Sequence, residues 1–294
     1  MATLTSHNYM VGLFIFMVIS LGSGSEYFSM EWLDNGKRGV KSNNTFKYYN
    51  TGVRLGIIDP EKYSLKSFKR HEKYFRNTLK TYNKLKGDDP LTYGEWLLLN
   101  NYGILRDTQM SILENKKKAL SKRTNKKQFV KTVRKGDILV TNKKGTGLVG
   151  HVGMMATNKC AIEMPGGKGW ASGIKDNNRR LSAGAWYDEY SSAYTMVYRC
   201  LGKGVANKAG DWAYHNYYNP KGGRKKTIHT TYRITPDFSK KNPSYCSKLV
   251  LQAFYFTERR VVIDHVIRYG PFIIPAKITS YFTPHCEMSY VGRF

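Results

Sequence analysis

The chain changes its residue pattern near Phe129, and this change limits the folds that it can adopt. Before it, apolar residues such as Leu65, Phe68 and Phe75 recur at spacings of three, four and seven, which is the period of an amphipathic helix. After it, short apolar runs such as 136–140 alternate with glycines, as expected for buried strands. A helical region followed by strands indicates an α+β protein.

The helical part predicts two helices joined as a hairpin. The first begins at Ser64 and ends at the turn-forming residues 87–90, and the second continues to the basic tract at 116–118. Residues 26–60 are polar and rich in asparagine and glycine, which predicts loop with short elements. Residues 116–127 are dense in lysine and predict a solvated connector.

The part after Phe129 predicts four short strands and one buried helix. The strands are expected at 136–140, 150–156, 161–164 and 194–201, and the helix at 246–256. We therefore divide the chain into an N-terminal leader at 1–25, a mainly helical region at 26–128 and an α+β domain at 129–294.

The leader predicts export. Tyr9 to Leu21 is an apolar run followed by the small residues 22–25, and its length suits a signal peptide better than a span of about 20 residues. No lysine or arginine precedes the run, so an uncleaved anchor or a buried helix stays open as an alternative. We expect a secreted or envelope-associated bacterial protein.

The chain is strongly basic, since 48 Lys and Arg against 21 Asp and Glu give a net charge of +27. Such a charge attracts anionic wall polymers, membrane surfaces and nucleic acids alike. No motif that reads DNA or RNA is present, which argues against nucleic acid. The four cysteines lie far apart without a CxxC pair, which argues against a zinc knuckle and leaves the pairing of Cys160, Cys200 and Cys286 open.

Cys246 is the candidate nucleophile. Asn242, Pro243 and Ser244 favour a helix start, which places the cysteine near the N-terminus of the next helix, where the macrodipole stabilises a thiolate. Local N–H groups, including its own, are candidates to bind an oxyanion, and Tyr245 and Ser247 are candidate substrate or oxyanion contacts. The alternative is a cysteine that packs as a small apolar residue.

His151 and Glu163 are the candidate base and its orienting carboxylate. His151 lies between Gly150 and Gly153 in an apolar strand, where bare backbone leaves room for another group to approach. A three-residue loop at 156–158 would place Glu163 directly opposite His151 on the same face of a hairpin. A two-residue loop would turn Glu163 away, and His151 alone is equally a core histidine.

Three segments, GDILVT, GHVGMMATNKCAIEMPG and YCSKLVLQAFY, resemble in this order the NlpC-type papain-like hydrolases, specifically their circularly permuted YiiX-like branch. The resemblance covers about residues 132–282 and implies an antiparallel sheet packed on the nucleophile helix. It implies Cys246 as nucleophile, His151 as base and Glu163 as the orienting group. Tyr245 stands where non-permuted members typically carry Asp, as is common in the permuted branch. Permuted relatives include acyltransferases and lipid or amide hydrolases, so the wall-peptide substrate of the non-permuted members does not transfer directly.

The sequence thus predicts a thiol hydrolase that cleaves an amide, foremost in peptidoglycan peptides, through a thioester. One alternative is a lipid- or acyl-directed amidase, thioesterase or acyltransferase of the same fold, and another is a basic wall-polymer-binding protein without catalysis. The scattered histidines form no HExxH motif, which argues against a metal site. The resemblance to papain-like enzymes implies that neither a metal nor an organic cofactor is needed.

Overall fold

The computed structural model describes residues 44–294 apart from 87–89, 115–121, 144–146, 203, 265–266 and 268–271. The predicted leader at 1–25 lies outside the described residues. Within the described stretches, no helix combines the length and the apolar character that crossing a bilayer requires.

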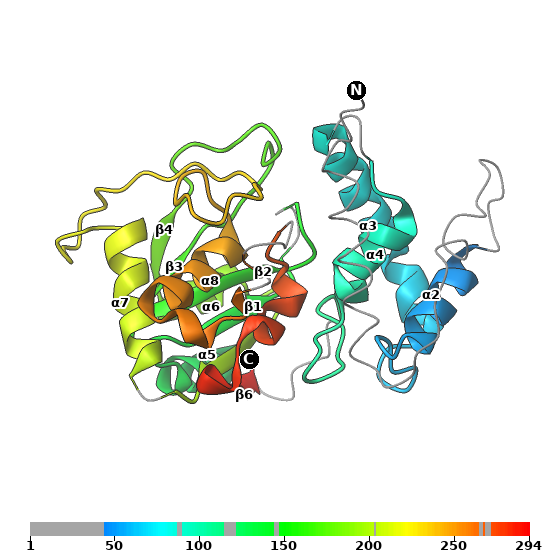
Figure 1. Cartoon of the computed structure of the whole chain (residues 1–294). Coiled ribbons are helices and arrows are strands. Elements are labelled where there is room, and N and C mark those ends of the chain that lie inside the picture. Colours follow the sequence, from blue (N-terminus) through cyan, green and yellow to red (C-terminus); the bar gives the residue numbers. More distant parts are fainter. Residues whose placement is uncertain are drawn as a thin grey trace, which may run out of the picture.

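The fold is α+β, as the sequence predicts, with helices at the N-terminal side of a sheet (Figure 1). The helices are α2 (Asn44–Arg54), α3 (Leu65–Lys86), α4 (Tyr93–Leu99), α5 (Lys122–Thr132), α6 (Ala183–Glu189), α7 (Val205–Tyr217) and α8 (Cys246–Thr257), with short 3₁₀ helices η2 (Asn101–Gly103), η3 (Arg259–Val261), η4 (Pro275–Tyr281) and η5 (Pro284–Cys286). The strands are β1 (Ile138–Thr141), β2 (His151–Thr157), β3 (Cys160–Glu163), β4 (Arg179–Ser182), β5 (Thr195–Cys200) and β6 (Met288–Arg293).

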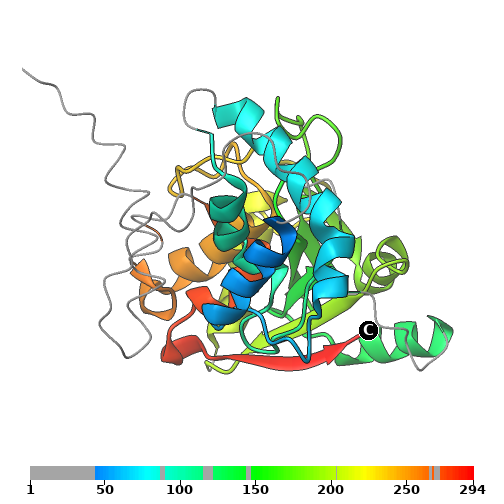
Figure 2. The same cartoon turned by 90° about the vertical axis from the view of Figure 1, so that its right-hand side faces the viewer.

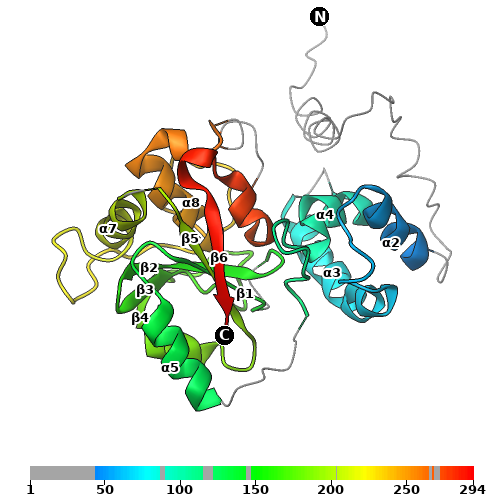
Figure 3. The ribbon, with the colours of Figure 1, turned by 90° about the horizontal axis from the view of Figure 1, so that it is seen from below.

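The six strands form one sheet in the order β4-β3-β2-β1-β5-β6, and every neighbouring pair is antiparallel. Helices cover both faces: α7 and α8 lie on one side and α5 on the other (Figure 3). Because side chains alternate along a strand, Ile138 and Val140 join the core with α7 and α8, whereas Leu139 packs with Phe129 and Trp186. β2 and β3 are therefore fully enclosed near the middle of the sheet.

The four strands and the late helix follow the sequence prediction. In α8, ten consecutive residues from Cys246 to Tyr255 are buried, including the polar Ser247, Lys248 and Gln252. The first part of this helix is therefore enclosed on every side. Its first residue is Cys246, and Tyr245 is the N-cap.

The helical region differs from its prediction in three places. α2 replaces part of the loop expected at 26–60, because Tyr49 is buried against Phe68 with ring centroids 5.9 Å apart. α5 replaces residues 122–127 of the expected connector, because Phe129 packs on Phe294. The second predicted helix ends at Leu99, since the chain then turns through positive φ angles of 50° and 54° at residues 101 and 102. The strands β4 and β6 and the helices α6 and α7 were not anticipated.

The helices α2, α3 and α4 pack beside the start of β2 and the loop before η4. Figure 2 shows them in front of the sheet when the molecule is viewed from their side. The Tyr82 ring of α3 meets the Phe272 ring at 5.7 Å, and the Val149 N–H donates to Asn100 Oδ1 at 3.2 Å. The N-terminal helices and the sheet share one continuous core.

Candidate active site

Cys246 occupies the first position of α8 and its side chain is fully buried. Helix N-termini carry unpaired N–H groups and a partial positive charge, both of which stabilise a thiolate. Burial alone raises the pKa of Cys246, but hydrogen bonding and charge from His151, together with the N–H of Val152 and the Ser247 hydroxyl, outweigh it and lower the pKa below the usual range. The thiol is thus tuned toward its reactive form.

His151 begins β2 and is held on all sides by neighbouring groups. Its Nε2 lies 2.6 Å from Glu163 Oε2, and the ring stacks on Trp186 with centroids 5.9 Å apart. Trp186 is itself fixed by donating from Nε1 to Thr195 Oγ1 at 3.0 Å. A base whose ring cannot rotate keeps one nitrogen permanently directed at its target.

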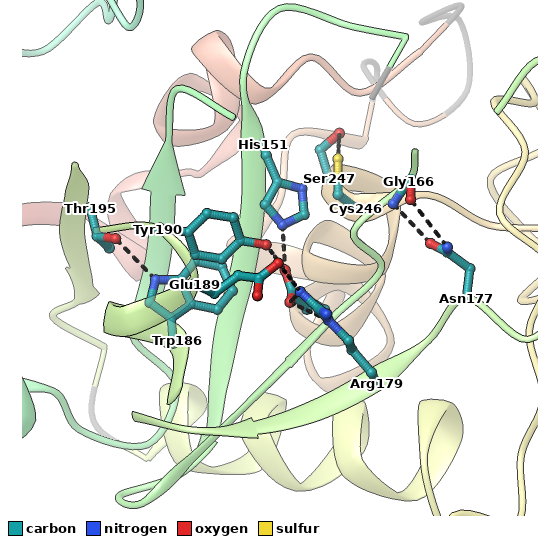
Figure 4. A network of polar contacts seen from close by, with 11 residues as sticks. His151, Gly166, Asn177, Arg179, Trp186, Glu189, Tyr190, Thr195, Cys246 and Ser247 are labelled. Carbon is teal, nitrogen blue, oxygen red and sulfur yellow. Dashed lines mark hydrogen bonds and ion pairs between the residues drawn. The ribbon is translucent and has the colours of Figure 1, made fainter. Parts of the chain in front are cut away.

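The second ring nitrogen of His151 faces Cys246 (Figure 4). This Nδ1 is buried and has no nitrogen or oxygen partner among the described residues. Burial lowers the pKa of His151, but a hydrogen bond and charge from Cys246, and the same from Glu163, raise it overall. Each group therefore shifts the other toward the thiolate–imidazolium pair.

Glu163 on β3 anchors the arrangement with a fully buried carboxylate. Its Oε2 accepts hydrogen bonds from His151 and from the Tyr190 hydroxyl, each at 2.6 Å, and its Oε1 accepts from Arg179 Nε at 2.7 Å. Burial raises the pKa of Glu163, yet these donors and the adjacent positive charges bring it down to about 2. The carboxylate stays ionised and orients the imidazole.

The hairpin brings His151 and Glu163 together in a register that differs from the predicted one. Glu163 lies opposite Gly153, and a bulge between Met155 and Thr157 separates this pairing from Thr157↔Cys160. Direct opposition of His151 and Glu163 is therefore wrong. The offset is two residues, and because side chains alternate with a period of two, both still point to the same face.

The glycines around His151 leave room for other groups to approach, as the sequence predicts, and the groups that approach are packed side chains. A Cβ on Gly153 would lie 2.6 Å from Trp186, and one on Gly150 would lie 2.2 Å from Ile112. Gly150 also has a φ of +90°, which suits glycine far better than other residues. The bare backbone admits the side chains that hold the histidine strand.

The two residues that flank Cys246 make contacts with the loop before η4. The Ile273 N–H donates to the Tyr245 hydroxyl at 2.9 Å, and Ser247 Oγ donates to the Ile273 carbonyl at 2.6 Å. Ser247 Oγ is also 4.0 Å from Cys246 Sγ. Both hydroxyls therefore contact the backbone of Ile273, in the loop before η4.

Tyr232 is a neighbour of the thiol that the sequence did not reveal. Burial raises the pKa of Tyr232 well above 10, and the charge and hydrogen bonding of Cys246 raise it further. Its backbone exchanges two hydrogen bonds with Ile174, at 2.8 and 3.0 Å, and bridges Ser244. Tyr232 is thus a neutral hydroxyl held beside Cys246. Fourteen residues and no recognisable motif separate the two in the sequence.

Arg179, Tyr190 and Trp186 complete the surroundings of the buried carboxylate and ring. None of the three was predicted as a site residue from the sequence. All three residues come after β3 in the sequence. They lie near Glu163 because β4, which contains Arg179, pairs with β3 and is followed directly by α6. Across the residues that the structure describes, no group of three His, Cys, Asp or Glu is placed to hold a metal ion.

Comparison with known proteins finds one family and one curated relative of relevance. A family model described as lipoprotein N-acylation protein LnsA-like matches residues 97–292. A protein of Bacillus thuringiensis, described only as an uncharacterized 30.3 kDa protein, is 30% identical over 217 residues, which cover 71% of this chain and 74% of the relative. No solved structure matches the chain significantly.

Proposed function

Because the chain belongs to the LnsA-like family of lipoprotein N-acylation proteins, which are acyl-directed enzymes, we propose that it transfers an acyl group through a thioester on Cys246. The observation that carries the proposal is the buried Cys246–His151–Glu163 arrangement, with a lowered pKa at the thiol and a raised pKa at the imidazole. Acyl transfer by a thiol requires these two shifts together.

The first step forms the acyl-enzyme. The Cys246 thiolate attacks the carbonyl carbon of an ester or amide, and the carbonyl electrons move onto oxygen. As the tetrahedral intermediate collapses, the bond to the leaving group breaks and His151 Nδ1 donates its proton to the departing alcohol or amine. Glu163 stays ionised throughout, which is supported by its pKa of about 2.

The oxyanion of that intermediate needs donors that are already in place. Tyr232 is suited to this role because its raised pKa keeps the hydroxyl protonated beside a thiolate. The N–H groups at the start of α8 are the other candidates, because Cys246 is the first residue of that helix and helix N-termini carry unpaired N–H groups. We assign the oxyanion site to these groups together.

The second step transfers the acyl group to an acceptor. A neutral amine attacks the thioester carbonyl, His151 accepts its proton, and the thiolate departs, which leaves an N-acyl product and the starting ion pair. The family description, lipoprotein N-acylation, supports an amine of a lipoprotein as acceptor. Water in the same position gives hydrolysis, so cleavage of peptidoglycan peptides stays a prediction of the sequence that the same experiment can test.

The reactivity of the thiol is tested by the rate of iodoacetamide alkylation of Cys246 against pH, followed by mass spectrometry. Wild type is expected to label at neutral pH with an apparent pKa well below the value of about 8.5 for free cysteine. His151→Ala should raise that pKa. Identical profiles in both proteins would refute the dyad.

The transfer itself is tested by intact-mass measurement after incubation with a nitrophenyl acyl ester, then with a synthetic lipopeptide that bears a free N-terminal amine. We expect an acyl adduct that Cys246→Ala abolishes and that the lipopeptide removes as an N-acyl product. Cys160→Ala is the matched control, because Cys160 is the other buried free cysteine among the described residues. Wall peptides run in parallel identify the hydrolase instead.

We further propose that the protein acts outside the cytoplasm, at an anionic surface. A disulfide joins Cys200 and Cys286, and such bonds persist mainly in oxidising compartments. The net charge of +27 favours anionic lipid or wall polymer. Release of the bound protein by moderate salt is expected, and binding that salt does not weaken would contradict this.

A further inference from the structure

The backbone directly before His151 is held by side chains from the N-terminal region of the chain. The Val149 N–H donates to Asn100 Oδ1 at 3.2 Å, and Ile112 occupies the space beside Gly150. The Ile112 carbonyl in turn accepts a hydrogen bond from the Tyr194 hydroxyl of the strand region. The residues that lead into β2 therefore have little freedom to move independently of these contacts.

Tyr74 on α3 makes the contact nearest to the candidate active site. Its hydroxyl donates to the Leu148 carbonyl at 3.4 Å, and the Gly150 N–H also hydrogen-bonds to it. Burial raises the pKa of Tyr74 to about 12, opposed by hydrogen bonds from Thr78 and Gly150. The phenol thus joins two main-chain groups, the second of which immediately precedes His151.

The hydroxyl of Tyr74 also interacts electrostatically with Tyr232, the residue beside Cys246. Tyr74 contributes to the raised pKa of Tyr232, whose hydroxyl hydrogen-bonds with Cys246. Tyr74 is partly buried, and its hydroxyl end contacts the backbone of Leu148. Tyr74 therefore connects α3 with the backbone before His151 and with the surroundings of Tyr232.

The N-terminal helices also contact the loop whose next residue holds the two neighbours of Cys246. The Tyr82 ring of α3 meets Phe272 edge-on at 5.7 Å, and the next residue, Ile273, holds both Tyr245 and Ser247. One helix, α3, thus contacts the loop before His151 through its Tyr74 and the loop behind Cys246 through its Tyr82. His151 and Cys246 belong to different elements, and a rigid helix that contacts the loops beside both of them helps to keep the distance between them constant.

We propose that Tyr74 is a positioning residue for His151, and that α3, although it lies before the family-matched region 97–292, is a working part of the acyl-transfer site. The proposal rests on the function given above and extends it to a helix that the family match does not cover. Tyr74 acts by positioning: its phenol holds the backbone from Leu148 to Gly150, and that backbone holds the imidazole of His151 in place relative to the thiol of Cys246.

The test compares Tyr74→Phe with Tyr49→Phe, each measured in the full chain. Both substitutions remove one phenol-to-carbonyl hydrogen bond, since the Tyr49 hydroxyl donates to the Tyr63 carbonyl at 2.9 Å within the N-terminal helices. Tyr74→Phe should slow the alkylation of Cys246 at neutral pH by about fivefold, the equivalent of one net hydrogen bond, and raise its apparent pKa. Tyr49→Phe should leave both values at wild type.

A second readout keeps the result independent of turnover. Hydrogen exchange of the peptide that contains residues 147–151 should accelerate in Tyr74→Phe and stay unchanged in Tyr49→Phe. Superimposable alkylation profiles for wild type and Tyr74→Phe would overturn the proposal, as would an equal shift in Tyr49→Phe. If no thioester forms in wild type but the profile still shifts in Tyr74→Phe alone, the proposed function fails while the positioning role stands.

Discussion

Replacing Glu163 with glutamine removes a buried charge while it preserves the shape of the side chain. Three donors meet this carboxylate: His151 at 2.6 Å, Tyr190 at 2.6 Å and Arg179 at 2.7 Å. A glutamine offers one acceptor oxygen and an NH₂ group that must face one of the donors. If the NH₂ faces His151, Nε2 becomes an acceptor, the proton moves to Nδ1, and the ring can no longer take a proton from Cys246.

The size of the effect follows from the bond that is lost. A hydrogen bond to a charged group contributes about 1.5–3 kcal/mol, which corresponds to about one to two units in the pKa of His151. The thiolate form of Cys246 depends on the imidazolium, so its population at neutral pH should fall by about ten- to a hundredfold. The unfolding free energy should fall as well, because Arg179 loses its buried carboxylate partner and retains the more exposed Glu189.

The assay is the pH dependence of Cys246 alkylation, with urea unfolding in parallel. Glu189→Gln is the matched control, because this carboxylate also binds Arg179, at 3.1 Å. Within the described residues it has no hydrogen bond or ion pair with His151. We expect a large shift for Glu163→Gln and almost none for Glu189→Gln. An alkylation profile of Glu163→Gln that matches wild type would refute the orienting role of the carboxylate.

Three further outcomes are expected. Gly153→Ala places a methyl group 2.6 Å from Trp186 and should lower the unfolding free energy by about 1–3 kcal/mol, as urea titration will measure; an unchanged midpoint would contradict the close packing. Replacing Cys200 and Cys286 with serine removes a disulfide between residues 86 positions apart and should lower the unfolding free energy by about 4 kcal/mol. Equal unfolding free energies of wild type with and without reductant would argue against the disulfide. Because the pKa of Glu163 is about 2 rather than 4.5, its stabilising effect is complete above pH 4.5 and is lost as the pH falls toward 2; an unfolding free energy that is constant across this range would disprove it.

The local patterns around the dyad were sufficient to find its members. Glycine punctuation and apolar runs predict β1, β2, β3 and β5, and a helix-start signal places Cys246 at the first turn of α8. These features depend on neighbours within a few residues, which the sequence displays directly. The same patterns predicted the length of α3, whose apolar spacing is regular over its whole extent.

The elements that were missed depend on distant partners. α2 and α5 are polar helices with weak local signals, and each is held by one buried aromatic residue, Tyr49 and Phe129 respectively. β4 and β6 lie at the two edges of the sheet and consist of half-exposed residues. Propensity is a weak guide wherever packing decides the outcome.

The sequence by itself determined which residues can do chemistry here: a cysteine at a helix start, a histidine in a strand and a glutamate in the next one. The tertiary structure decided how they meet. The hairpin register moved Glu163 by two residues without changing its face, because side chains alternate with a period of two. Only tertiary packing brought Tyr232 to the thiol and Tyr74 to the backbone before His151, since contacts between residues 14 and 74 positions apart leave no periodic trace in a single chain.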